Sequence, residues 1–399
     1  MPLSSEILHF VREHLDDDPN KLQFQKKNYP DNRVAIAVEQ IRARERIRTK
    51  LPSWYANTAV FYPSELATEQ CSSELTANYK ARLVTGDTLC DLTGGMGVDS
   101  YFFSRAASHV TYVEQNPLYC EAARYNFQIL GTENIEVING DATQVAGTLT
   151  AESYYIDPSR RTRDNRRIFA LADYEPNVLE IKEQLLAQGK RLIVKMSPME
   201  DITAVASLLP ETTDIHVLSV KNECKELLFV LEATPANKAI TVHTVNFTSA
   251  GTEQYFAFTP EEEREAPSRL TGTVGKYLYE PNSSILKSGA FKLPAIRYNL
   301  SKLHQHSHLY TGDTLVCDFP GRIFQIQEVF DFSSKWLKQI AKTLPKANIT
   351  TRNFKISADE IRSRGKIKDG GNTYLFATTL NDGKAVIIQG EKPDSSYSF

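Results

Sequence analysis

The sequence predicts an α/β protein with a mostly parallel sheet, preceded by a helical region and followed by an α+β region. Short apolar strands alternate with helices between residues 87 and 231, a pattern typical of βαβ units. Residues 1–70 instead carry apolar side chains at helical spacing, and alternating strand patterns take over after residue 233. A length of 399 residues also predicts more than one domain.

The composition is that of a soluble globular protein, with 41% hydrophobic and 24% charged residues. The apolar runs are of strand length, so we expect no membrane span, and the first residues lack the pattern of a signal peptide. Five cysteines without a C-x-x-C pair argue against a disulfide framework or a zinc ribbon. We therefore expect a cytoplasmic protein.

The N-terminal region, residues 1–70, is predicted to hold two amphipathic helices, at Glu6–Leu15 and Arg33–Arg48. The second has a basic face, which either is simply solvated or contacts nucleic acid. Its basic residues are Arg42, Arg44, Arg46 and Arg48.

A glycine-rich turn follows the first predicted strand, Asp87–Leu92, and precedes a helix. The turn reads Asp91-Leu-Thr93-Gly94-Gly95-Met-Gly97, and its glycines let the backbone approach a ligand closely. The carboxylate of Asp91 would repel a pyrophosphate but would suit amino and hydroxyl groups. S-adenosylmethionine carries an ammonium and a sulfonium and no phosphate, so it is favoured over a nicotinamide dinucleotide. A tight turn that binds no ligand remains the alternative.

Polar residues also follow each of the next three strands, so four strand ends face one crevice. The strand 109–113 leads to Glu114 and Gln115, which lie next in the chain. Glu114 comes 23 residues after Asp91, near the offset expected of a ribose-binding acid. After a helix at 117–130, the strand 135–138 leads to Asp141 and Ala142, which suit an adenine ring and its amino group.

The fourth strand, 153–156, ends in Asp157-Pro158-Ser159-Arg160. Together these strand ends resemble the motifs of class I S-adenosylmethionine-dependent methyltransferases, over roughly residues 70–233. The resemblance implies a Rossmann-like seven-stranded sheet, with six parallel strands and an antiparallel last one. Matching strands are predicted at 191–195, 215–220 and 226–231. The resemblance also implies that Asp91, Thr93, the three glycines, Glu114, Gln115, Asp141 and Ala142 bind the cofactor.

The acceptor motif of the family, N/D-P-P followed by an aromatic residue, is altered here. Ser159 replaces the second proline and Arg160 the aromatic residue, although a guanidinium plane can also stack on a base. Asp157, Pro158, Ser159 and Arg160 are the catalytic candidates, with Asp157 orienting an amino group toward the methyl donor. Residues 195–198, directly after the fifth strand, include no cysteine, which argues against a covalent mechanism.

Two flanking segments add candidates. Arginines after the acceptor motif either bind nucleic-acid phosphates or form a solvated loop; they are Arg161, Arg163, Arg166 and Arg167. Before the first strand, residues 69–80 resemble an additional methyltransferase motif, a helix capped by Ser72 or Ser73. Gln70, Ser72 and Ser73 either contact the cofactor or belong to an ordinary packing helix.

The C-terminal region is predicted to be basic. Residues 284–399 hold 17 Lys and Arg against 10 Asp and Glu, a net charge of +7 in a chain whose total is −3. Strands are predicted at 241–247 and 255–258, an acidic loop or linker at 261–265, and a hairpin turn at 380–384. A strand would place His304, His306 and His308 on one face, where three imidazoles could bind zinc. Because no Cys or carboxylate lies nearby, a surface strand without a metal is expected instead.

Several stretches of this region resemble the C-terminal THUMP-like region of a group of bacterial methyltransferases. They are Tyr277–Asn282, Thr351–Phe354, and the helix 356–362 followed by Lys366 and Lys368. By analogy with THUMP domains, Lys366 and Lys368 become RNA-binding candidates. The expected domains are the N-terminal helical region 1–70, the methyltransferase domain 71–233, a ferredoxin-like α+β region 234–323 and a THUMP-like RNA-binding domain 324–399.

The functional hypothesis is an S-adenosylmethionine-dependent methyltransferase that acts on a base nitrogen of tRNA or rRNA. It needs neither a metal nor a membrane. Two alternatives remain: a methyltransferase of proteins or small molecules, and a non-catalytic RNA-binding protein that keeps the methyltransferase fold.

Overall fold

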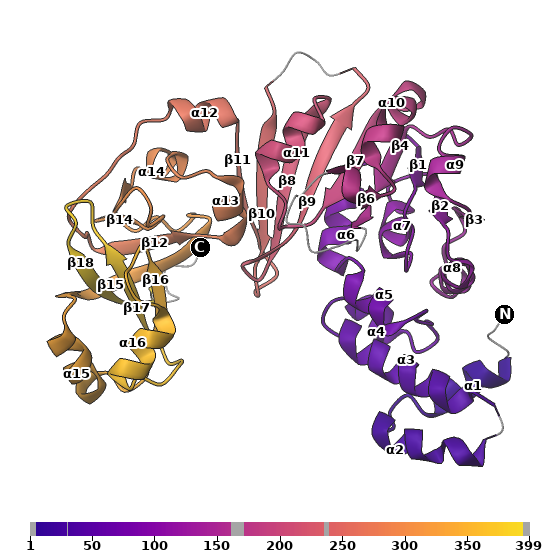
Figure 1. The fold of residues 1–399 in the computed structure, drawn as a ribbon, viewed down its shortest axis with the longest axis horizontal. Coiled ribbons are helices and arrows are strands. Elements are labelled where there is room, and N and C mark those ends of the chain that lie inside the picture. The colour runs from indigo at the N-terminus through magenta and orange to yellow at the C-terminus, as the bar shows by residue number, and fades with distance from the viewer. Residues whose placement is uncertain (1–4, 30, 161–170, 235–238, 394–399) are drawn as a thin grey trace. The chain divides into compact units, whose positions relative to one another are not determined.

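The computed structural model describes residues 5–29, 31–160, 171–234 and 239–393 (Figure 1). It contains two compact units. The first unit comprises residues 1–215 and 226–238, and the second comprises residues 216–225 and 239–399. Among the described residues, no helix is both long and apolar enough to cross a lipid bilayer.

The first unit begins with short helices, in agreement with the prediction. They are α1 (Ser5–Glu13), α2 (Pro19–Phe24), η1 (Gln25–Asn28), α3 (Arg33–Ile47), α4 (Pro52–Ala56) and α5 (Glu65–Gln70). Phe10, Leu22 and Val34 pack in a small core of their own. Two arginines of the basic α3 have partners within the protein: Arg46 pairs with Glu65 and Glu69, and Arg44 lies over the Tyr55 ring.

Seven strands of a nine-stranded sheet lie in the Rossmann-like order β3-β2-β1-β4-β7-β9-β8. They are β1 (Thr88–Asp91), β2 (His109–Glu114), β3 (Ile135–Asn139), β4 (Ser153–Ile156), β7 (Arg191–Met196), β8 (Thr212–Val220) and β9 (Glu223–Glu232). The pairs from β3 to β7 are parallel, whereas β9 runs antiparallel to β7. The predicted methyltransferase sheet with an antiparallel last strand is therefore confirmed.

Helices connect these strands and bury their apolar faces against the sheet. They are α6 (Glu74–Ala81), α7 (Val98–Phe103), α8 (Pro117–Ile129), α9 (Ala142–Val145), α10 (Val178–Gln188) and α11 (Ile202–Leu208). Trp54, Phe102 and Tyr112 belong to the principal core on one side of this unit. A short two-stranded sheet, β5 (Ser159–Arg160) with β6 (Tyr174–Glu175), follows the acceptor motif, and η2 (Leu171–Asp173) precedes β6.

The second unit includes the turn of the β8–β9 hairpin, where Lys221 and Asn222 both have positive φ. The predicted strands β10 (Thr241–Phe247) and β11 (Glu253–Phe258) continue the order beyond β8. A separate sheet has the order β13-β14-β12-β15-β18-β17-β16. Its strands are β12 (Tyr277–Pro281), β13 (Ser301–Lys302), β14 (Tyr310–Gly312), β15 (Gly321–Asp331), β16 (Asn348–Arg352), β17 (Thr373–Thr379) and β18 (Ala385–Glu391).

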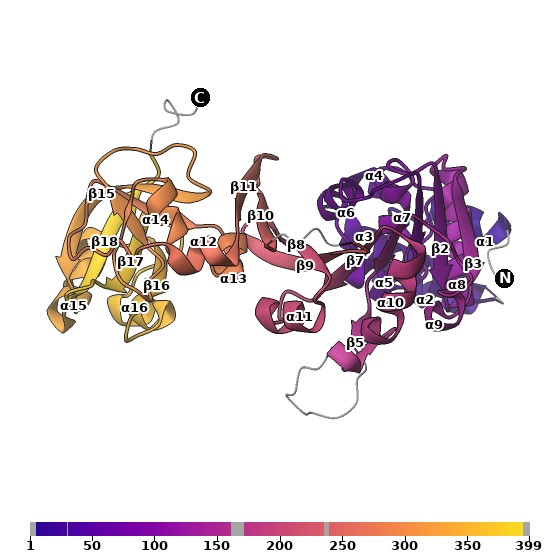
Figure 2. The ribbon, with the colours of Figure 1, turned by 90° about the horizontal axis from the view of Figure 1, so that it is seen from above.

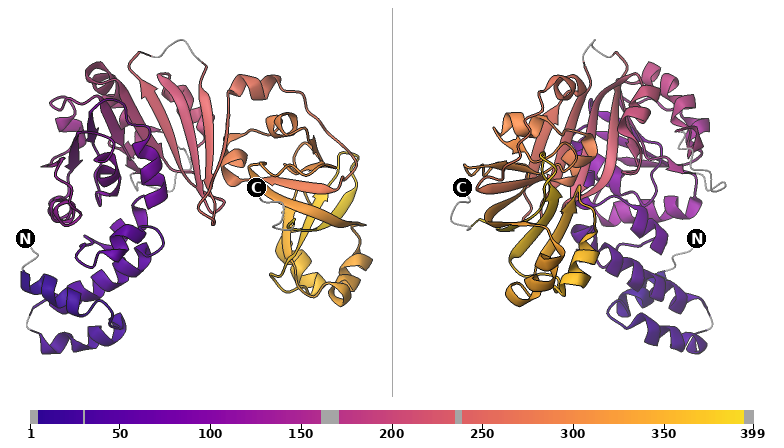
Figure 3. Two further views of the ribbon diagram at one scale, coloured as in Figure 1. Left: turned by 180° about the vertical axis from the view of Figure 1, so that it is seen from behind. Right: turned by 60° about the vertical axis from the view of Figure 1, so that its left-hand side comes forward.

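The helices of this unit are α12 (Pro260–Glu265), α13 (Ser283–Ser288), α14 (Leu293–Arg297), α15 (Ser334–Thr343) and α16 (Ala358–Gly365). The last two lie side by side, as Figures 2 and 3 show, and pack with Leu375 and Ile387 of the sheet. The predicted hairpin turn between β17 and β18 is confirmed, with Gly383 at φ 86°.

Two sequence predictions were wrong here. The acidic segment Glu261–Glu265 is helical, because Pro260 starts α12 and Thr259 forms a capping box with Glu262. The three histidines do not share a strand. Residues 304–307 form a turn between β13 and β14, in which the His306 backbone N–H donates to His304 Nδ1 at 3.0 Å.

Leu278 is fully buried in the core of the second sheet. We expect Leu278→Ala to lower the free energy of unfolding by about 2–5 kcal/mol, because it leaves a cavity. Urea unfolding followed by Trp336 fluorescence in a Trp54→Phe background measures this in the second unit. Val329, which is 41% exposed in the same sheet, supplies the control: Val329→Ala should cost much less. Equal costs would contradict the assignment of this core.

Candidate cofactor and acceptor site

The glycine-rich turn between β1 and α7 has a tightly constrained backbone. Gly95 and Gly97 have φ values of 54° and 85°, in the left-handed region that favours glycine. A Cβ on Gly94 would lie 2.2 Å from the Tyr112 ring. The Gly94 N–H donates to the Val113 carbonyl at 2.8 Å, and the Tyr112 hydroxyl donates to the Gly95 carbonyl at 2.6 Å. The turn therefore packs directly on β2.

Asp91 is fully buried at the end of β1. Its Oδ2 accepts a hydrogen bond from Ser100 Oγ at 2.6 Å, and its Oδ1 accepts one from the Thr93 N–H at 3.1 Å. Burial raises the pKa of this carboxyl to about 7. Both oxygens thus stabilise the turn and the start of α7, and a direct cofactor contact by Asp91 stays a prediction.

Glu114 lies at the end of β2, with Gln115 exposed beside it. The two carboxylate oxygens of Glu114 accept hydrogen bonds from the Gly95 N–H at 3.0 Å and the Asn116 N–H at 2.7 Å. A carboxylate has about four lone-pair sites, so each oxygen can still accept a hydroxyl. The glycine turn and its neighbouring acid are therefore held together before any ligand binds.

Asp141 is the N-cap of α9, directly before the buried Ala142. Its Oδ1 accepts from both the backbone N–H and the hydroxyl of Thr143, at 2.8 and 2.6 Å. These hydrogen bonds hold the pKa of Asp141 below its ordinary value. The side chain stays ionised and is oriented as an acceptor.

The segment before β1 is joined to α7. Ser73 caps α6, as predicted, by accepting from the Thr76 N–H at 3.2 Å. Ser72 is buried and donates to Asp99 Oδ2 at 2.8 Å. Gln70, at the end of α5, is exposed. Ser72 therefore acts within the protein, while Gln70 has a side chain open to a ligand.

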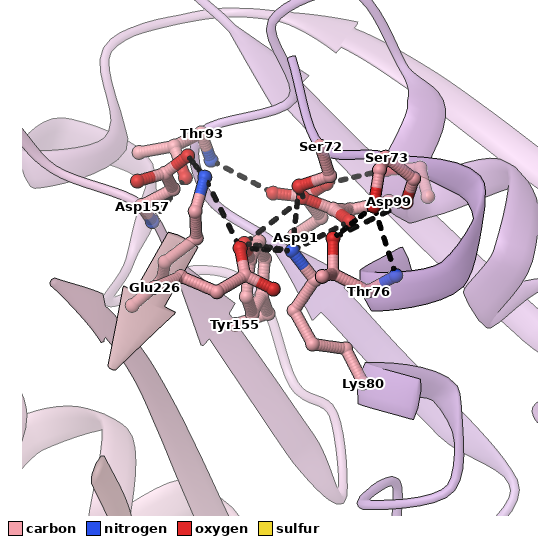
Figure 4. Close-up of polar contacts among 12 residues, drawn as sticks. Ser72, Ser73, Thr76, Lys80, Asp91, Thr93, Asp99, Tyr155, Asp157 and Glu226 are labelled. Carbon is pink, nitrogen blue, oxygen red and sulfur yellow. Dashed lines mark hydrogen bonds and ion pairs between the residues drawn. The ribbon is translucent and has the colours of Figure 1, made fainter. Parts of the chain in front are cut away.

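A buried charged cluster lies next to these residues (Figure 4). It consists of Lys80, Asp99, Tyr155, Lys195 and Glu226. Lys80 Nζ is 2.9 Å from Asp99 Oδ1 and 3.2 Å from Glu226 Oε2, and the Tyr155 hydroxyl donates to Asp99 Oδ2 at 2.9 Å. The members come from α6, α7, β4, β7 and β9, so the cluster ties five elements together.

The acceptor motif contacts this cluster through Lys195. The Lys195 ammonium lies 2.5 Å from Asp157 Oδ2 and 3.8 Å from Glu226 Oε2. Burial opposes the charge on Lys195, but the carboxylates of Asp157, Glu226 and Asp99 raise its pKa above the ordinary value. Lys195 is therefore a permanent cation at physiological pH.

Asp157 also meets the first motif, because its backbone N–H donates to Thr93 Oγ1 at 2.6 Å. Pro158 is buried, while Ser159 and Arg160 are exposed in β5. The arginines predicted to follow, Arg161, Arg163, Arg166 and Arg167, lie outside the described residues. The structure thus brings the first and fourth motifs together.

Sequence reasoning missed the buried charged cluster. A signal was present, since Lys195 directly follows the apolar run 192–194 and Glu226 directly precedes the apolar run 227–231. A charge in a buried strand is costly unless it is paired. Lys195 and Glu226 therefore each require a partner, which the sequence does not identify. Those partners come from residues far away in the chain.

The arrangement fits a phosphate-free nucleoside cofactor. The glycine turn leaves no room for a side chain at Gly94, and Glu114 and Asp141 are carboxylates that suit hydroxyl and amino donors. Together with the sheet order, this defines a class I S-adenosylmethionine-dependent methyltransferase.

Comparison with known proteins agrees. A crystal structure named "putative methyltransferase" from Porphyromonas gingivalis W83 is 35% identical, covers 99% of this chain and 100% of its own, and superposes with a TM-score of 0.89. The chain belongs to the same family, that of S-adenosylmethionine-dependent methyltransferases with ferredoxin-like and THUMP-like C-terminal domains.

Two further matches support the cofactor. Proteins from Mycobacterium tuberculosis strains CDC 1551 and H37Rv, each named an uncharacterized S-adenosylmethionine-dependent methyltransferase, are 25% identical over 357 residues. Those residues are 88% of this chain and 94% of theirs. Residues 277–320 match a ferredoxin-like domain model and residues 321–392 a THUMP domain-like model. The predicted cofactor, S-adenosylmethionine, is confirmed.

The raised pKa of Asp91 predicts a pH dependence of stability. The folded-state pKa of about 7 exceeds the roughly 3.9 of an unfolded chain. Between these values the folded protein keeps a proton that the unfolded chain releases, so the free energy of unfolding falls as pH rises. We expect wild type to lose about 1.4 kcal/mol per pH unit between pH 5 and 6.5 relative to Asp91→Asn.

Urea unfolding at several pH values, followed by Trp54 fluorescence in a Trp336→Phe background, measures this difference in the first unit. The difference between the two proteins isolates Asp91 from other titrating groups. A difference that is constant across this range would show that Asp91 is already ionised.

Proposed function

We propose that this protein methylates a base nitrogen of structured RNA, either tRNA or rRNA. The observation that carries the proposal is the match of residues 321–392 to a THUMP domain-like model beside a methyltransferase fold. THUMP domains typically bind RNA. We also propose that the chain divides into domains after residues 70, 233 and 323, as predicted from the sequence, and that residues 324–399 form the RNA-binding domain.

The basic residues around α16 support an RNA-binding role unequally. Arg362 pairs with Asp359 and Asp369, and Arg364 pairs with Glu360. Lys366 and Lys368 are exposed, and Lys366 ends α16 in a left-handed conformation. The two lysines are therefore better placed than the arginines to meet phosphates.

Asp157 is the proposed catalytic residue. Its carboxylate would accept a hydrogen bond from the N–H of the acceptor base and orient the nitrogen lone pair. S-adenosylmethionine supplies an electrophilic methyl group when bound. The nitrogen–carbon bond forms as the carbon–sulfur bond breaks, sulfur keeps the electron pair, and the nitrogen releases a proton to solvent. Pro158, Ser159 and Arg160 would shape the position of the base.

The proposed cofactor contacts follow the strand ends. Glu114 would bind the ribose of the cofactor, and Asp141 and Ala142 would bind its adenine. The backbone of the glycine turn would contact the rest of the cofactor. Gln70, exposed at the end of α5, would reach the cofactor from the other side. Asp91 and Ser72 would support these contacts from within the protein.

We expect Asp157→Asn to lower methyl transfer to RNA by about 100-fold or more, because positioning is lost. Cofactor affinity should change little, since Asp157 is proposed to face the acceptor. The assay uses radiolabelled S-adenosylmethionine and bulk RNA from a strain lacking the protein, followed by nucleoside mass spectrometry. Asp201→Asn, at the N-cap of α11, is the matched control. RNA that stays unlabelled by active wild type would refute RNA as the substrate.

We expect the double substitution of Lys366→Ala and Lys368→Ala to weaken binding of tRNA or rRNA. Each lost phosphate contact should reduce the slope of affinity against salt by about 1. Binding measured at several salt concentrations tests this. The ion-paired Arg364→Ala should have a smaller effect. An unchanged slope in the double variant would exclude these lysines from the RNA interface.

A further inference from the structure

We propose that Lys195 is a positioning residue that acts through Asp157. Its ammonium holds the Asp157 carboxylate in one orientation, so that Asp157 can orient the methyl acceptor. The inference rests on the catalytic role proposed for Asp157.

The sheet itself places the two side chains together. Strands β4 and β7 are parallel neighbours with Ile156 opposite Val194. Asp157 and Lys195 are the next residues along these strands, and their charged atoms are 2.5 Å apart. The contact therefore follows from the register of two central strands.

Asp157 is fixed at two points. Its backbone N–H donates to Thr93 Oγ1, and its Oδ2 is held by Lys195. Among the described residues, none donates a hydrogen bond to Oδ1, and the side chain is 36% exposed. The carboxylate thus offers one oxygen to a group that enters from outside.

The charge on Lys195 needs an explanation beyond packing. The side chain is 13% exposed, in a strand whose neighbours Val194 and Met196 are buried. Replacing a buried ion pair with apolar residues is often neutral or stabilising. Glu226 lies closer to Lys80 than to Lys195, at 3.2 Å against 3.8 Å. The closest partner of Lys195 is Asp157.

The pairing restricts what Asp157 can do. An ionised carboxylate only accepts hydrogen bonds, so the group facing it must be a donor, as the N–H of an amine or amide is. Because Lys195 holds Oδ2, Asp157 meets the acceptor through Oδ1 and stabilises the positive charge that develops on the methylated nitrogen, which releases its proton to solvent.

The experiment first finds the acceptor. Purified protein and radiolabelled S-adenosylmethionine are added to an extract of a strain lacking the protein, and RNA, protein and small molecules are separated. Label in RNA supports the proposed function. Label in another fraction overturns the RNA proposal but supplies the acceptor with which Lys195 is tested, so the two failures are distinguishable.

The labelled acceptor is then used to compare Lys195→Met, Lys195→Arg, Asp157→Asn and the double variant of Lys195→Met with Asp157→Asn. We expect Lys195→Met to lower kcat by about 10- to 100-fold, with cofactor affinity within about twofold. Lys195→Arg should recover much of the rate because it keeps the charge. The double variant should be no slower than Asp157→Asn alone, since residues that act as a unit are not additive.

Lys182→Met is the matched control, because Lys182 is another buried lysine, paired with Glu211 on the same unit. It should lower thermal stability without lowering kcat. The proposal is overturned if the losses from Lys195→Met and Asp157→Asn multiply in the double variant. It is also overturned if Lys195→Arg is as slow as Lys195→Met while both remain folded.

Discussion

The pairing of buried charges at one end of the central strands β4, β7 and β9 is the constraint on which the site depends. Lys80 and Lys195 are both buried among the carboxylates of Asp99, Asp157 and Glu226. Removing one member of such a group leaves an uncompensated charge, which is strongly destabilising. The ends of β4, β7 and β9 and the helices α6 and α7 are therefore held in one arrangement. That arrangement determines where the acceptor motif lies.

The glycine turn is connected to the same end of the central strands. Gly94 packs against the Tyr112 ring, and a Cβ on Gly97 would lie 2.9 Å from Phe127. Thr93 connects the turn to Asp157, and Ser100 connects α7 to Asp91. The cofactor motif and the acceptor motif are thus parts of one hydrogen-bonded structure. Such rigidity is what methyl transfer requires, because the reaction is accelerated mainly by orientation.

The C-terminal sequence matches two domain models, yet their strands share one sheet. Residues 277–320 contribute β12, β13 and β14, and residues 321–392 contribute β15 to β18. Strands β12 and β15 are paired at the junction, where the buried Glu280 pairs with Arg322 and Arg352. The two matched segments therefore share one folded sheet.

The sequence by itself determined the strands of the parallel sheet, the glycine turn and the acids at the strand ends, because hydrophobic periodicity and glycine conformation are local properties. It did not determine how the charges pair. Lys80 and Glu226 are separated by 146 residues, and only the folded sheet brings them together. The acidic helix α12 was also missed, because a proline and a capping box start it. The histidine turn was missed because its local hydrogen bonds override the strand-like alternation of the histidines. Tertiary structure alone decided which internal hydrogen bonds Asp91 and Ser72 make and that Lys195 faces Asp157. Burial makes an unpaired charge costly, and the partner that relieves this cost is set by the register of neighbouring strands.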